Sequence, residues 1–228
     1  MRRHGYYIVS LILALMSQAN FSNAAQPIEV WVGAPADGTW PSACTPEKSF
    51  YPSNACSLPA WHWDLNSGSG AMNDGDWSVD LRIKPGVKLY LYVAPQVSTD
   101  VITTQVEAVT DACTTGKGGK AVKIAVYNKS LAKIGQIIYA HLVPADGVKA
   151  GAKIDSWGGY LGKVADKADG LTYNTKCWTG PHVHFEMYNR KGFSCYNRGF
   201  TPDSTFSSTN FLGFLGGDRV STPRTPCP

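Results

Sequence analysis

The stretch Ala121-Val122-Lys123-Ile124-Ala125-Val126-Tyr127 decides the fold class, because its side chains alternate with the period of two that is typical of a β-strand. Residues 135–142 follow as the expected hairpin partner of this strand. Long segments with a helical period of 3.6 residues are missing, while the chain contains 23 glycines and 14 prolines. Strands separated by turns are therefore the better interpretation.

Further segments fit the same architecture. Residues 81–93 indicate two strands around the turn dipeptide Pro85-Gly86, residues 101–109 indicate another, and residues 182–189 indicate one more after the segment 173–180. We expect a mostly β protein, an antiparallel β-sheet single domain in which long, disulfide-stapled loops form a groove over the sheet. Its expected parts are a loop-rich N-terminal part (26–76), the sheet with the site (77–190) and a C-terminal wrap (191–228).

The N-terminus has the pattern of a secretory signal peptide over residues 1–25. Arg2 and Arg3 precede an apolar run over residues 6–16, and small residues follow at Asn23-Ala24-Ala25. The run is shorter than the ~20 residues that cross a bilayer. We expect cleavage after Ala24 or Ala25, no stable membrane anchor afterwards, and a secreted or periplasmic protein.

Charge excludes one class of partner. The 228-residue chain has 21 Lys and Arg against 17 Asp and Glu, and removing Arg2 and Arg3 leaves 19 against 17. No basic stripe with interleaved aromatic residues is present, so we expect no nucleic-acid partner. We also expect a monomer.

All six cysteines lie in the exported part, where oxidising conditions favour disulfides. They are Cys44, Cys56, Cys113, Cys177, Cys195 and Cys227. No Cys-x-x-Cys spacing indicates thiolate metal ligation, and six cysteines allow 15 pairings. Our working expectation pairs Cys44 with Cys56 and Cys177 with Cys195, leaving the other two to close the tail.

Two histidines in the run Gly180-Pro181-His182-Val183-His184-Phe185-Glu186 are the main functional signal. Two residues apart on one strand, their imidazoles leave the same face and reach one small volume, which is typical of half a zinc site. The alternative interpretation is a pair of polar residues on a wet face. A third histidine, in Tyr139-Ala140-His141-Leu142, ends another strand.

These two motifs resemble those of the lysostaphin-type, or LytM-domain, zinc metalloendopeptidases, in particular their LasA-like branch. The resemblance covers about residues 79–188, half of the chain, and includes the segment 143–154 with its Val148-Lys149-Ala150-Gly151 turn. It implies a zinc-dependent endopeptidase of the bacterial cell envelope that hydrolyses peptide bonds in peptidoglycan cross-links or bridges, acting on peptidoglycan peptides or Gly-rich peptides. The alternative is a noncatalytic LytM-like protein that binds the wall or activates a hydrolase.

Carried over by resemblance, the zinc ligands are His62, Asp80 and His184, and the catalytic residues beside the metal are His141 and His182. The common His-x-x-x-Asp spacing of the family does not occur here, and His62 precedes Asp80 by an insertion like that of the LasA-like branch. An inserted loop costs little free energy, because loop-closure entropy grows slowly with length. Asp64, two residues after His62, is the competing carboxylate, and Asp76 in place of the histidine is a poorer alternative.

Three further residues have a functional and a purely structural interpretation. Glu186 shares a strand face with His184 and would orient its imidazole, or it is an exposed residue at a strand end. Tyr139 is a hydrogen-bond donor to a substrate groove or a plain strand residue. Tryptophans near the motifs, including Trp157 and Trp178, would wall that groove or pack loops.

Overall fold

The structure is a computed structural model that describes residues 28–36, 38–39, 78–81, 83–113, 116–173, 177–178, 180–190, 192–196, 205–206 and 211–219. The expected signal peptide, His62, Asp64 and Asp76 lie outside these residues. Among the described residues, no helix has both the length and the apolar character needed to cross a membrane.

The protein is mostly β, and every strand pairing among the described residues is antiparallel. The strands are β1 (Glu29–Gly33), β2 (Gly38–Thr39), β3 (Ser78–Leu81), β4 (Lys88–Pro95), β5 (Ile102–Asp111), β6 (Lys120–Asn128), β7 (Lys133–Pro144), β8 (Lys153–Ile154), β9 (Trp157–Val164), β10 (Val183–Asn189), β11 (Gly192–Phe193), β12 (Cys195–Tyr196), β13 (Thr205–Phe206) and β14 (Phe211–Gly216). The helical content of the described residues is one 3-10 turn, η2 (Lys167–Asp169).

The main sheet follows the order β12-β14-β1-β4-β9-β7-β6-β5-β8, and β10 joins it beside β7 and carries β3 and β11. The hairpin that the alternating pattern predicts is present as β6 and β7, with Ile124 opposite Ile137. The antiparallel β prediction is therefore confirmed, with β4 after the Pro85-Gly86 turn and β5 close to its expected position.

Besides β1, which lies in the part expected to be loop-rich, the sequence interpretation missed strand β9. It contains Gly158, Gly159 and Gly162, which weaken a strand pattern because glycine has no side chain to alternate. A Cβ at Gly159 would overlap the Asp155 carbonyl oxygen, and a Cβ at Gly162 would overlap that of Val143. These glycines therefore allow neighbouring backbone to approach β9.

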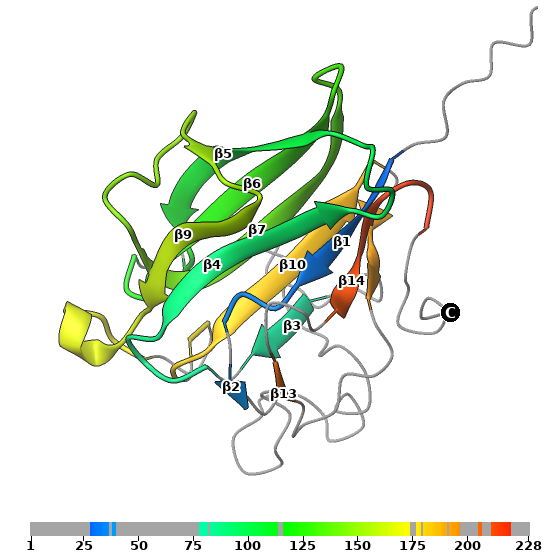
Figure 1. The fold of residues 1–228 in the computed structure, drawn as a ribbon. Coiled ribbons are helices and arrows are strands. Elements are labelled where there is room, and N and C mark those ends of the chain that lie inside the picture. Colours follow the sequence, from blue (N-terminus) through cyan, green and yellow to red (C-terminus); the bar gives the residue numbers. More distant parts are fainter. Residues whose placement is uncertain are drawn as a thin grey trace, which may run out of the picture.

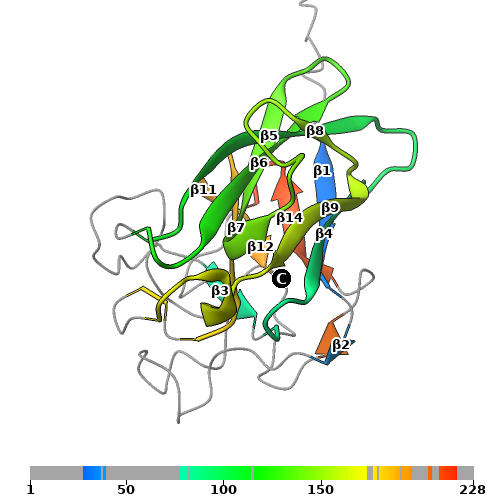
Figure 2. The ribbon, with the colours of Figure 1, turned by 90° about the vertical axis from the view of Figure 1, so that its left-hand side faces the viewer.

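The sheet curls so that β1, β4 and β9 form a layer over β7 and β10, as Figures 1 and 2 show from two sides. Side chains of both layers fill the space between them, and the largest core cluster joins Leu89 and Leu91 of β4 with Phe185 and Met187 of β10. Because successive side chains of a strand point to opposite faces, the intervening residues of β10 face away from this core.

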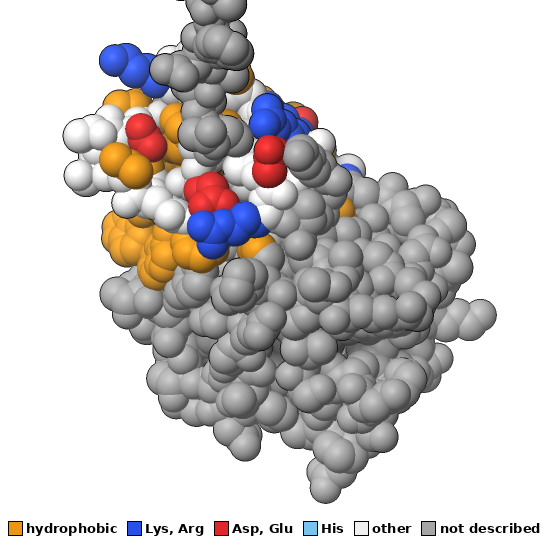
Figure 3. Space-filling view, turned by 90° about the vertical axis from the view of Figure 1, so that its right-hand side faces the viewer, with side chains coloured by type: hydrophobic (Ala, Val, Ile, Leu, Met, Phe, Trp, Pro, Cys, Tyr) orange, Lys and Arg blue, Asp and Glu red, His pale blue; other side chains and the backbone are white. Residues whose placement is uncertain are grey.

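The outer face of β1, β4 and β9 carries aromatic side chains. Trp157 is 48% exposed and stacks on Trp31, with ring centroids 5.5 Å apart, and Tyr160 is 42% exposed beside Tyr90. In Figure 3 hydrophobic side chains gather at the left, and this side of the picture corresponds to the front of the molecule in Figure 1. Trp157 thus belongs to the layer opposite the one that carries the histidines.

Candidate functional site

Strand β10 places His184 and Glu186 on the face that points away from the main core. Both residues are buried, with 4% and 0% of their surface exposed. His184 Nε2 hydrogen-bonds to Glu186 Oε1, and the Tyr188 hydroxyl donates to Glu186 Oε2 at 2.8 Å. Glu186 is therefore an enclosed carboxylate in contact with the imidazole that it was expected to orient, and it is not an exposed residue at a strand end.

Two further imidazoles are held by backbone carbonyl groups. His182, just before β10, is 6% exposed, and its Nδ1 lies 2.8 Å from the Gly180 oxygen. His141, near the end of β7, is 3% exposed, and its Nδ1 lies 2.7 Å from the Gly118 oxygen. Because a carbonyl oxygen only accepts, Nδ1 carries the proton in both rings, and Nε2 carries the lone pair of each neutral imidazole.

The backbone of β7 changes direction at His141. Ala140 and His141 together face the single residue Ala121 of β6, which makes this position a β-bulge. Strand β7 pairs with β10 up to Ala140 and with β9 from Leu142 onward. His141 itself has φ +65°, a left-handed conformation that is uncommon for residues other than glycine. Bulges re-aim side chains, and this one turns His141 toward His182 and His184.

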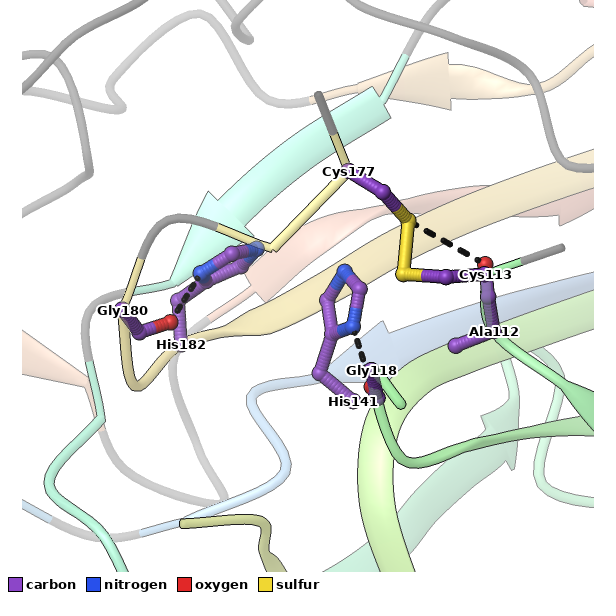
Figure 4. The surroundings of a disulfide bond; sticks show 7 residues. All are labelled: Ala112, Cys113, Gly118, His141, Cys177, Gly180 and His182. Atoms are coloured by element: carbon purple, nitrogen blue, oxygen red, sulfur yellow. Dashed lines mark hydrogen bonds between the residues drawn. A yellow bond between two sulfur atoms is a disulfide. The ribbon is translucent and has the colours of Figure 1, made fainter. Parts of the chain in front are cut away.

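The three imidazoles lie together. The His141 and His182 ring centroids are 4.6 Å apart in an edge-on arrangement, and those of His141 and His184 are 6.3 Å apart. Figure 4 shows the first pair side by side, each with its hydrogen bond to a carbonyl group. Thus the two separate sequence motifs converge on one buried cluster.

Strand β3 brings Asp80 next to this cluster. Asp80 is directly opposite His184 in the antiparallel pairing of β3 with β10. Residues directly opposite one another belong to the same face of a sheet. The register therefore puts Asp80 at the position of a close cross-strand neighbour of His184.

The predicted metal ligands lie partly outside the residues that the structure describes. Within the described ranges, no group of three or more His, Cys, Asp or Glu side chains is arranged to hold a metal ion. His62 and Asp64 lie outside these ranges, and Asp80 is described by its backbone. The assignment of His62, Asp80 and His184 as ligands stays a prediction.

The expected pairing of Cys177 with Cys195 is wrong, because Cys177 forms a disulfide with Cys113. The same bond rules out Cys113 as the partner of Cys227. Cys195, on β12, is disulfide-bonded as well. The chain folds the Gly-rich loop after β5 against the segment before β10, and spacing along the sequence gave no indication of this contact.

Trp178, which follows Cys177, is buried beside His141. The two rings are nearly parallel, with an interplanar angle of 15° and centroids 5.9 Å apart. Trp178 also makes a T-shaped contact with the ring of Tyr173, and the two ring centroids are 4.4 Å apart. Gly118 is thus a contact of the site that sequence reasoning missed, while Trp178, which was expected to wall a groove or to pack loops, contacts the ring of His141. A backbone acceptor leaves no mark in a sequence, whereas Trp178 stood close to the His182 motif.

Tyr139 faces the core and does not line a groove. It is fully buried, pairs with Phe185 of β10 and packs on that ring at 5.3 Å. Burial raises the pKa of its hydroxyl above the ordinary value. The groove interpretation of Tyr139 is therefore corrected to that of a core residue.

Comparison with known proteins assigns no family. No family model matches the chain, and no curated protein matches it. Among solved structures, Csd3 of Helicobacter pylori is similar over 75% of this chain, with 19% identity and a TM-score of 0.36. The chain spans 36% of the length of that protein. A likeness of this size assigns neither family nor activity.

Proposed function

We propose that the protein is a secreted zinc-dependent endopeptidase that hydrolyses peptide bonds in peptidoglycan cross-links or bridges. One observation carries the proposal: His141, His182 and His184, from two motifs that resemble those of LytM-domain enzymes, form one buried cluster. Burying three polar rings together costs free energy, because each ring loses its contact with water.

The donors near the cluster suit zinc. Zn²⁺ in catalytic sites takes imidazole nitrogens and a carboxylate and keeps one position open. Glu186 occupies Nε2 of His184, so a metal would bind through Nδ1 of this ring. A carboxylate behind a ligating imidazole is the usual arrangement around zinc and strengthens the ligand.

Asp80 is the preferred carboxylate, because it is directly opposite His184 in the sheet. With His62, these residues would form a His-Asp-His set. Bound Zn²⁺ would act as a Lewis acid toward the scissile carbonyl and lower the pKa of water toward ~7.

His141 and His182 would handle protons. In each neutral ring the hydrogen bond to a carbonyl fixes the proton on Nδ1 and leaves the lone pair on Nε2. Nε2 can then accept a proton from the attacking water and later donate it to the leaving amine. Imidazole suits both steps near neutral pH.

The disulfides support an exported location. Structural disulfides persist in oxidising compartments. The chain has such disulfides at Cys113–Cys177 and at Cys195. Peptidoglycan lies on the same side of the bacterial membrane.

The test combines metal analysis with digestion of purified peptidoglycan by the full exported chain, with released fragments identified by mass spectrometry. We expect one zinc per chain and defined peptide fragments. His184→Ala should lose both, whereas His141→Ala should keep the zinc and lower kcat by about 10²–10⁴-fold, the usual contribution of a general acid or base. Asp80→Asn and Asp64→Asn form a matched pair, in which only the first should release zinc.

Folded, metal-free protein that leaves peptidoglycan intact would reject the enzyme proposal. If the same protein sediments with peptidoglycan, the noncatalytic wall-binding alternative would replace it.

A further inference from the structure

We propose that the Cys113–Cys177 disulfide is a brace that positions the His141 imidazole, so that full activity requires the oxidised chain. The inference rests on the proposed function for its effect on turnover. Its structural part, the hold of the disulfide on the ring, stands on the contacts alone.

The first of these contacts runs through Gly118. Its carbonyl oxygen accepts the hydrogen bond from His141 Nδ1 at 2.7 Å. Gly118 also packs directly on the disulfide, since a Cβ at this residue would overlap the sulfur of Cys113. The position of the acceptor is therefore set by the Cys113 end of the bond.

The second contact runs through Trp178. This residue follows Cys177 in the sequence, and its ring stacks on the His141 ring. Its Cβ would lie 3.5 Å from a Cβ at Gly118, so the two segments touch. Figure 4 shows the disulfide joining the segment of Cys177 to the loop that carries Gly118, with His141 between the disulfide and His182.

A single covalent bond thus ties both neighbours of one ring. The two cysteines are 64 residues apart in sequence, and their Cα atoms are 6.0 Å apart. The backbone of His141 is fixed separately by the bulge in β7. Losing the disulfide would therefore release the acceptor and the stacking surface together, while the Cα of His141 stays in place and its ring turns.

Reduction provides the corresponding chemical step. A dithiol such as dithiothreitol transfers two electrons and two protons to the sulfur pair, which gives the thiols of Cys113 and Cys177 and the cyclic disulfide of the reagent. Because the reagent also reaches the disulfide of Cys195, substitutions isolate the bond in question.

The test compares Cys177→Ser with Cys195→Ser in the full exported chain, since each removes one sulfur of one disulfide. Cys195 lies on β12, which pairs with β14, whereas His141 lies on β7. We expect Cys177→Ser to lower kcat by about 10–10²-fold with KM within about twofold and zinc content unchanged, because supporting contacts of a catalytic group typically contribute this much. Cys195→Ser should keep the kcat of the unaltered chain.

A spectroscopic measurement makes the result independent of catalysis. With ¹⁵N-labelled histidine, the Nδ1–H resonance of His141 should shift or be lost to solvent exchange in Cys177→Ser and stay unchanged in Cys195→Ser. An unchanged resonance, or an equal fall of kcat in both variants, would overturn the brace. If the unaltered chain holds no zinc and cuts nothing, the proposed function fails while the resonance still decides the inference.

Should Cys177→Ser fail to fold, Trp178→Leu replaces it. This variant keeps the disulfide and the Gly118 acceptor and removes the stacked ring, so the His141 resonance should move by a part of the same shift. An unmoved resonance in this variant would also reject the proposal.

Discussion

Removing the hydroxyl of Tyr139 should stabilise the protein. The side chain is fully buried among apolar residues, and its oxygen has no hydrogen-bond partner among the described residues. A buried polar group without a partner costs about 1–3 kcal/mol. Tyr139→Phe deletes the orphaned oxygen and keeps the ring that packs on Phe185 at 5.3 Å. We therefore expect the free energy of unfolding to rise by about 1 kcal/mol or more.

Urea unfolding followed by tryptophan fluorescence measures this change, and Tm should rise by about 2–4 °C per kcal/mol in a chain of this size. Tyr188→Phe is the matched control, because its hydroxyl donates to the Glu186 carboxylate at 2.8 Å. Losing a hydrogen bond to a charged group should cost about 1.5–3 kcal/mol. The reasoning is refuted if Tyr139→Phe lowers stability, since that result requires a partner for the hydroxyl.

Three other substitutions have equally defined outcomes. The Tyr173 hydroxyl donates to the Asp166 carboxylate at 2.6 Å, which lowers the pKa of Asp166, while burial and that carboxylate raise the pKa of Tyr173. The contact needs ionised Asp166 and neutral Tyr173, so the stability lost in Tyr173→Phe should be greatest between about pH 4 and pH 10 and shrink on either side, as urea titrations at several pH values would reveal. Gly119→Ala should lower the free energy of unfolding by more than about 2 kcal/mol, because φ is +77° and the new Cβ would lie 2.9 Å from the Leu142 carbonyl oxygen. Gly151→Ala, at φ +84° with open space around the new Cβ, should lower it by only about 1–2 kcal/mol. Equal losses in thermal unfolding would contradict the steric argument.

Alternation along the sequence was sufficient to predict the β6–β7 hairpin and the strand that carries His184, because period two is a local property, although His182 lies just before that strand. It could not tell which face of β7 is the inner one. Tyr139 and His141, two residues apart, would share a face on a regular strand, and the bulge at Ala140 and His141 separates them into core and site.

Long-range contacts were the other part that sequence could not supply. The Cys113–Cys177 bond, the Gly118 acceptor and the position of Asp80 opposite His184 all depend on how distant segments meet. Nothing in composition or spacing encodes such meetings directly. The glycines of β9 were visible, but their role as points of backbone approach became clear only from the packing around them.

The surplus residue in β7 has an evolutionary consequence. A shift of one residue in a strand moves each side chain to the opposite face of the sheet. The number of residues in this part of β7 is therefore constrained more tightly than the identity of its apolar residues. Exchanges of apolar residues between Ile137 and Leu142 should be tolerated, whereas a one-residue insertion or deletion in the same interval would rotate the imidazole of His141 out of its cluster. In homologous chains that keep this histidine, we expect indels to accumulate in the connecting loops and to be excluded from this hexapeptide.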